Sequence, residues 1–167
     1  MIVFLRVLRL LSMVVWVGGL IFFAFVLAPI AFHVLPSTHE AGTVVAGTLA
    51  ILNDKIGLVC GFVFVMALPW RIRHTSARLF LAEILCVAGM MAATMVVQWG
   101  IVPQMERDRI AAGGDVDAAS PDNIARLDFE RLHPWSEKVE GMTLLLGLGV
   151  VVMMGFEDAR NYPATVA

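Results

Sequence analysis

The stretch LLSMVVWVGGLIFFAFVLAPIAF, residues 10–32, decides the fold because it contains no charged side chain. A helix rises about 1.5 Å per residue, so this stretch reaches about 35 Å, enough to cross a hydrocarbon layer of about 30 Å. The alternative is a cleaved signal peptide, with Arg6 and Arg9 as its basic start. Against this, the apolar run is too long, and Ala28 is followed by Pro29 and further apolar residues. We therefore predict a retained membrane helix.

The composition of the whole chain excludes an ordinary water-soluble domain. Of its 167 residues, 59% are hydrophobic and only 16% are charged, whereas soluble domains carry about 25% charged residues. The net charge of −2 comes without a basic cluster, so we expect no nucleic-acid partner. Cys60 and Cys86 lie in apolar runs and are too few for a disulfide framework.

Three more apolar stretches follow the first, so the sequence predicts an all-α polytopic membrane protein, a four-transmembrane-helix bundle in a single domain. The expected helices cover about 5–34, 49–70, 79–102 and 136–156. The polar outer segment, about 103–135, is expected to be a partly helical loop between helices three and four. Within it, Gly113–Gly114 should interrupt any helix. Ser120 with Pro121 resembles the N-cap and first position of a helix.

The basic residues predict an orientation and one ion pair. Lys and Arg are denser at the helix ends on the side of the N-terminus, which predicts that both termini are cytoplasmic. Because the chain is short and compact, we expect a bacterial inner membrane. Glu83 lies about one turn inside the third helix, an expensive place for an unpaired carboxylate. Its expected partners lie at the same level, namely Arg6, Arg9, Arg71 and Arg73.

Small residues indicate close helix packing. Gly57 and Gly61 form a G-x-x-x-G pattern, and Gly18 stands beside Gly19. In a membrane such positions let a neighbouring backbone approach closely. The neighbour can be another helix of the same bundle or a helix of a second protomer, and both alternatives stay open.

A set of residues along the chain resembles the transmembrane-protein-205-like domain family. In the first half these are Trp16, Gly19, Pro29, Phe32, Leu35-Pro36 and Gly42. In the second half they are Pro103, Met105, Arg107, Phe129, His133 and Ser136. The resemblance covers nearly the whole chain and implies a small integral membrane domain without an established activity, whose eukaryotic relatives are associated with drug resistance and trafficking. The chain departs from the family at Pro134, where a glycine is expected, and at Glu140, where a polar amide is expected.

The candidate ligands for a metal lie on the predicted outer side. Imidazoles and carboxylates at neighbouring helix ends can bind a transition metal, and a histidine can hold a haem. His133 is the first candidate, because the resemblance and its position both favour it, and Asp54, His33 and His39 are its expected partners. No local ligand pair such as H-x-x-x-H or C-x-x-C is present. Polar side chains at the headgroup level are therefore the default interpretation.

The sequence contains no nucleophile elbow, no glycine-rich phosphate loop and no paired inward carboxylates. We therefore expect a protein that is not an enzyme, needs no cofactor and supports a membrane complex, trafficking or export. Its expected partners are the lipid bilayer and either further copies of itself or a larger membrane complex. The alternative is a metal- or haem-binding membrane protein with its site at the outer helix ends.

Overall fold

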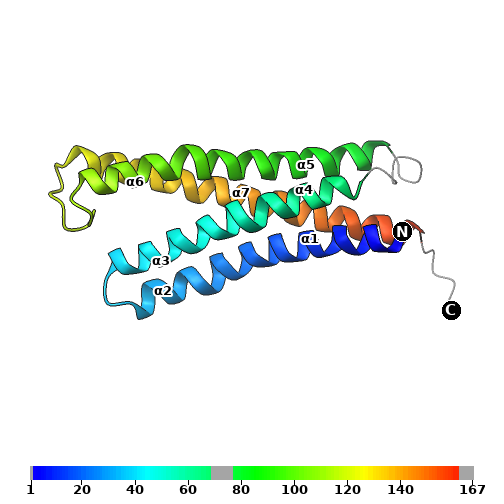
Figure 1. The fold of residues 1–167 in the computed structure, drawn as a ribbon, viewed down its shortest axis with the longest axis horizontal. Helices are drawn as coiled ribbons and strands as arrows, with labels where there is room; N and C mark the ends of the chain where they lie inside the picture. The colour runs from blue at the N-terminus through cyan, green and yellow to red at the C-terminus, as the bar shows by residue number, and fades with distance from the viewer. Residues whose placement is uncertain (1, 69–76, 162–167) are drawn as a thin grey trace.

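The computed structural model describes residues 2–68 and 77–161, and these residues form helices and turns without a strand (Figure 1). Three of the four long helices contain a π-helical segment. Helix one comprises α1 (Ile2–Phe22), η1 (Phe23–Leu27) and α2 (Ala28–Val34). Helix two comprises α3 (Thr38–Ala50), η2 (Ile51–Gly57) and α4 (Leu58–Met66), and helix three comprises α5 (Ala77–Met95), η4 (Val96–Ile101) and α6 (Val102–Ala111). Helix four is α7 (Ile124–Asn161).

The predicted fold class is confirmed. All four helices are long and apolar enough to cross a membrane, and large apolar side chains cover their outward faces. Phe25 is 71% exposed and Leu145 is 69% exposed. A soluble monomer rarely exposes so much contiguous apolar surface, whereas lipid tails are a suitable solvent for it.

Helices two and three extend further than predicted. Helix two begins at Thr38 rather than near residue 49, because Ser37 caps it by accepting a hydrogen bond from the Glu40 amide at 3.1 Å. The predicted end at residues 69 and 70 lies outside the described residues. Helix three continues past Pro103 to Ala111, since Pro103 lies in the first turn after a π segment, where its missing N–H is tolerated. The predicted glycine break follows, with positive φ at Gly113 and Gly114.

The polar helix predicted after Ser120 and helix four, predicted at about 136–156, form one continuous helix. It begins at Ile124 and not at Pro121, because residues 121–122 form a turn. Asn123, and not Ser120, is the cap: its Oδ1 accepts hydrogen bonds from the amides of Ala125 at 2.9 Å and Arg126 at 3.3 Å. From there the helix runs through Pro134 without interruption into the apolar span.

Substituting Asn123→Ala should therefore destabilise the start of α7 by about 1 kcal/mol, the usual contribution of an N-cap. Amide hydrogen exchange at Ala125 and Arg126 should become roughly fivefold faster. Ser120→Ala is the matched control and should leave these two amides unchanged. Faster exchange in the Ser120 variant alone would contradict this assignment of the cap.

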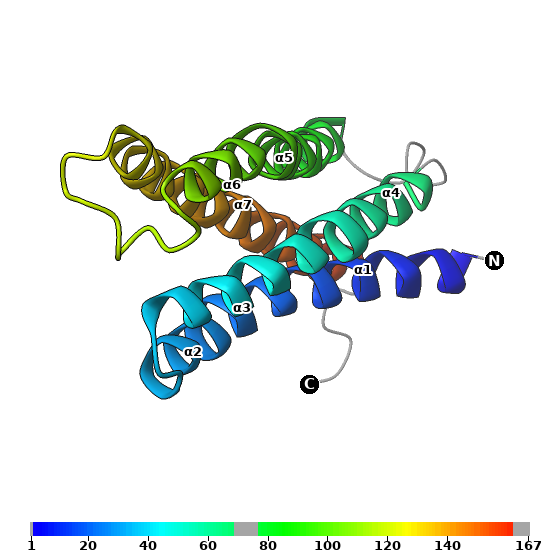
Figure 2. The same ribbon diagram turned by 60° about the vertical axis from the view of Figure 1, so that its left-hand side comes forward.

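The four helices pack as two hairpins. Helix one packs against helix two, helix three packs against helix four, and α1 also contacts α7. Figures 1 and 2 show α2 and α3 lying apart from α6 and the first turns of α7, at the end of the bundle that carries the 112–123 loop. We call this the loop end. The core lies beyond it, around Trp16, Met13, Leu20, Phe64, Met90 and Val150.

A buried cation joins three helices at the opposite end of the bundle. Arg9 Nη2 donates to Glu157 Oε2 at 2.8 Å, and Arg9 Nη1 lies 3.9 Å from Glu83 Oε2. The Arg9 guanidinium carbon also lies 5.9 Å from the centre of the Phe64 ring. The predicted ion pair of Glu83 is thus confirmed for Arg9, whereas Arg71 and Arg73 lie outside the described residues.

Candidate functional site: a cleft between the two hairpins

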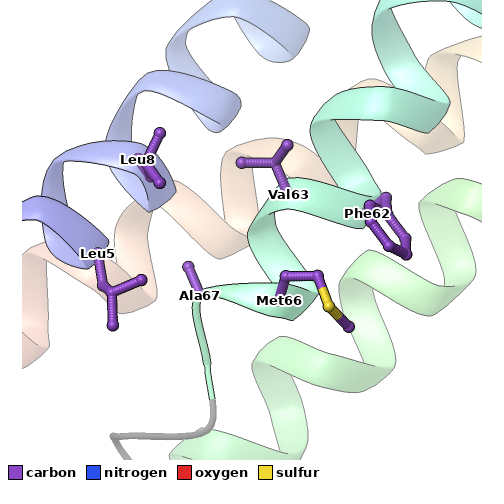
Figure 3. Close-up of a pocket in the computed structure, with 6 residues that line it drawn as sticks. All are labelled: Leu5, Leu8, Phe62, Val63, Met66 and Ala67. Atoms are coloured by element: carbon purple, nitrogen blue, oxygen red, sulfur yellow. The ribbon is translucent and has the colours of Figure 1, made fainter.

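The smaller of two hollows in the described part of the chain is lined by apolar side chains alone. It measures about 180 Å³ and lies between the start of α1 and the end of α4 (Figure 3). Its side chains are all apolar: Leu5, Leu8, Phe62, Val63, Met66 and Ala67. With no side-chain donor or acceptor among them, these residues can contact a lipid tail but cannot orient a polar ligand.

The second hollow is a cleft of about 980 Å³ between the two hairpins. Helices one and two form one wall, and helices three and four form the other. Most of the wall is apolar, with Phe23, Phe32, Val45, Leu49 and Leu144 among its residues. A mostly apolar hollow with a few polar groups is the usual form of a small-molecule site.

At the deep end of the cleft, away from the loop end, polar side chains of helices three and four line the wall, and Asn53 of helix two contacts one of them without lining the cleft itself. Asn53 is fully buried, and its Nδ2 donates to Glu140 Oε2 at 3.2 Å. Gln98 and Glu140 both line the cleft. By helical rise, Asn53 lies roughly 16 Å from Phe64, the residue at the level of Arg9, so these groups lie within the apolar layer if Arg9 marks its edge.

The π segments coincide with this deep end. Asn53 lies in η2, Gln98 lies in η4, and Phe23 and Ala24 of η1 line the same cleft. A π segment adds one residue to a turn and redirects the side chains around it, and such segments are frequent at functional sites. Three helices therefore change their geometry where the polar groups meet.

The loop end of the cleft is more polar. His39 and His133 line it, and the His133 ring stacks on Phe129 with ring centres 6.0 Å apart. His133 Nε2 lies 3.4 Å from Glu137 Oε1 on the same helix. Thr38 donates a hydrogen bond to the Asp117 carboxylate, which connects helix two to the 112–123 loop.

The structure places the four predicted metal ligands in different surroundings. His133 and His39 line the cleft, but His33 and Asp54 do not. Asp54 instead lies 3.5 Å from the Lys55 ammonium. Across residues 2–68 and 77–161, no three His, Cys, Asp or Glu side chains form a group that could hold a metal ion. The metal or haem site stays a prediction without a supporting geometry.

The residues at the deep end were not predicted as a site. Neither Asn53 nor Gln98 is among the predicted ligands, and Glu140 is named above only as a departure from the family pattern. The signal that could have found them is the cost of an amide or carboxylate within an apolar span, which makes such a residue a functional candidate by default. The contact between Asn53 and Glu140, which lie 87 positions apart in the chain, could not be predicted from the sequence.

Four apolar helices around a cleft with a polar deep end define a small multi-pass membrane protein. A family model described as a domain of unknown function, DUF4149, matches residues 11–110, which is more than half of the chain, and the chain belongs to this family. Asn53 and Gln98 lie inside the matched part, and Glu140 lies beyond it. No curated protein and no solved structure matches the chain.

Proposed function

We propose that this protein holds an amphipathic molecule in the cleft between its hairpins, and through it supports trafficking, export or a larger membrane complex. The observation that carries the proposal is the cleft itself, about 980 Å³ with apolar walls and polar groups at both ends. Its volume is at the upper end of the range for ligand pockets, about 300–1,000 Å³. A molecule with an apolar body and a polar group matches such a lining.

We further propose that the protein acts by binding and not by catalysis. Ser136, His133 and Glu137 are residue types found in hydrolytic triads, and all three line the cleft. However, the Ser136 hydroxyl donates to the His133 backbone carbonyl at 2.8 Å, and the His133 imidazole lies next to Glu137. A nucleophile needs its hydroxyl on the imidazole of the base, and this arrangement does not provide it.

The sequence supports the cellular part of the proposal. The resemblance to transmembrane-protein-205-like domains links the chain to relatives associated with drug resistance and trafficking. The distribution of Lys and Arg supports a bacterial inner-membrane protein with both termini in the cytoplasm. In this orientation the loop end of the cleft lies on the outer side of the membrane. Binding to further copies of itself or to a larger membrane complex would be compatible with holding an amphipathic molecule in the cleft.

Photoaffinity labelling in a bilayer tests the proposal. The protein is placed in phosphatidylcholine nanodiscs with a neutral fatty alcohol that carries a diazirine, and the labelled residues are mapped by mass spectrometry. We expect labelling within residues 38–50 and 98–105 to fall when unlabelled alcohol is added, because a site saturates. Labelling at the outward residues Phe25 and Leu145 should not respond, because lipid contact does not saturate.

Two substitutions on α3 provide the matched comparison. Ala46 lines the cleft, so Ala46→Phe should fill it and abolish the saturable labelling. Val44 is exposed on the same helix outside the lining, so Val44→Phe should leave the labelling intact. Labelling that never saturates in the wild type, or that survives in the Ala46 variant, would overturn the proposal.

A further inference from the structure

The deep end of the cleft concentrates acceptor oxygens that no protein group satisfies. In the described part of the chain, Asn53 Oδ1, Gln98 Oε1 and Glu140 Oε1 are buried and receive no hydrogen bond. The one contact among these three residues uses the Asn53 amide nitrogen and the other Glu140 oxygen. Buried polar atoms are normally paired, so the unpaired oxygens of Gln98 and Glu140, which line the cleft, and of Asn53 beside Glu140 call for a donor. The missing partner is rich in N–H or O–H groups.

The charges of the cleft favour a cation as this donor. One guanidinium, that of Arg109, lines the cleft, and it pairs with Glu106 at 2.6 Å. Glu140 accepts a hydrogen bond only from neutral Asn53 and faces no cation among the described residues. A carboxylate in an apolar layer is costly unless it is protonated or an opposite charge lies beside it. Six carboxylates line the cleft, and two of them, Glu106 and Glu130, pair with Arg109 and Arg126; the other four are Asp115, Asp117, Glu137 and Glu140.

An ammonium group fits the three acceptors better than a bare metal ion does. A protonated primary amine has three N–H donors and no acceptor, so it suits a site whose unpaired groups are side-chain oxygens. A hard cation such as Ca²⁺ takes six to eight oxygen ligands, more than this end of the cleft offers. The rest of the wall is mostly apolar and includes Leu20, Phe23 and Leu144. The group that carries the ammonium is therefore apolar.

We propose that the cleft binds an ammonium-bearing amphiphile, with the ammonium at the Gln98 and Glu140 oxygens beside Asn53 and the apolar body between the hairpins. This inference rests on the proposed function and adds the chemical class of the ligand. The ammonium can belong to a free amine or to an aminophospholipid headgroup. The two sources share the same chemistry at Glu140.

Competition against the photoactivatable fatty alcohol tests the ligand class. Dodecylamine, dodecanol and dodecanoate are compared in phosphatidylcholine nanodiscs, each as a mole fraction of total lipid. We expect the amine to displace the saturable label at a roughly tenfold lower mole fraction than the alcohol, because a charged donor strengthens each hydrogen bond. The carboxylate should be the weakest competitor, since it adds a negative charge beside Glu140.

The variant Glu140→Gln should reduce the advantage of the amine over the alcohol to about threefold or less, because neutral hydrogen bonds remain and the charge is lost. Asp128→Asn is the matched control: Asp128 is a carboxylate on the same helix, lies outside the lining of the cleft and pairs with Arg131 at 3.8 Å. The amine should keep its roughly tenfold advantage in this variant. The comparison of the three competitors in the wild type tests the inference even if the Glu140 variant does not fold.

The outcomes separate this inference from the proposed function. If no competitor reduces the labelling, the cleft is not a binding site and both fail. If alcohol and amine compete equally, or if the carboxylate competes best, the ammonium site is wrong and amphiphile binding stands. Replacing part of the phosphatidylcholine by phosphatidylethanolamine identifies the source. Reduced labelling in those discs supports a lipid headgroup, and displacement by the free amine alone supports a small molecule.

Discussion

Substituting Arg9→Met is expected to lower the free energy of unfolding by about 3–5 kcal/mol, the cost of removing one partner from a buried charge cluster. Arg9 is 5% exposed, and its two terminal nitrogens face the Glu157 and Glu83 carboxylates. The substitution keeps the apolar stem of the side chain but removes the guanidinium that draws helices one, three and four together. Equilibrium unfolding by sodium dodecyl sulfate in mixed micelles measures the effect.

Arg131→Met is the matched control for this experiment. Arg131 pairs with Asp128 at 3.8 Å, but its side chain is 78% exposed, so its removal should cost less than about 1 kcal/mol. The double variant Arg9→Met with Glu157→Met should recover part of the lost stability, because a pair of apolar side chains replaces a buried ion pair well. If both single variants lose the same small amount, the buried cluster does not hold the bundle together.

The sequence was sufficient to predict the features that depend on local composition. Four spans follow from charge-free stretches such as residues 10–32, and the break at Gly113–Gly114 follows from paired glycines. The ion pair of Glu83 could be predicted because a carboxylate inside an apolar span needs a cation at the same depth. In each case the free-energy cost of placing a particular residue type within one helix leaves few possible structures.

The ends of the helices and the positions of the π segments could not be predicted from local composition. Pro103 suggested the end of helix three, but a helix tolerates proline in the turn that follows a π segment. The π segments themselves have no known composition signal, and the structure places η2 and η4 around Asn53 and Gln98. A candidate site assembled from three helices depends on tertiary packing, which one sequence without its contacts does not define.

The Gly57–Gly61 pattern illustrates how packing resolves an ambiguity that spacing leaves open. A β-carbon on Gly57 would lie 2.7 Å from Trp16 Nε1, and one on Gly61 would lie 2.8 Å from Met91 Cγ and 3.0 Å from Trp16 Cζ3. Both glycines therefore make room for the fully buried Trp16 ring of helix one. The close approach occurs within one bundle, so the pattern by itself no longer indicates a contact between protomers.

Substituting Trp16→Ala should lower the free energy of unfolding by about 3 kcal/mol. This is the lower end of the range for large aromatic residues in cores, because lipid also shields the ring when the helices separate. The loss is one of packing, since Gly57 and Gly61 leave no side chain that could fill the space. Unfolding in mixed micelles again provides the measurement.

A double-mutant cycle shows whether the tryptophan and the glycine act as one unit. Gly57→Leu alone should destabilise the protein by about 1–3 kcal/mol, because its side chain collides with the indole. In the presence of Trp16→Ala the leucine enters the space that the ring has left, so the combined loss should be smaller than the sum. Gly18→Leu is the control, because a β-carbon at Gly18 meets nothing within 4 Å. Strict additivity, or a fall in oligomer mass without a change in unfolding, would mean that Gly57 contacts a second copy and not Trp16.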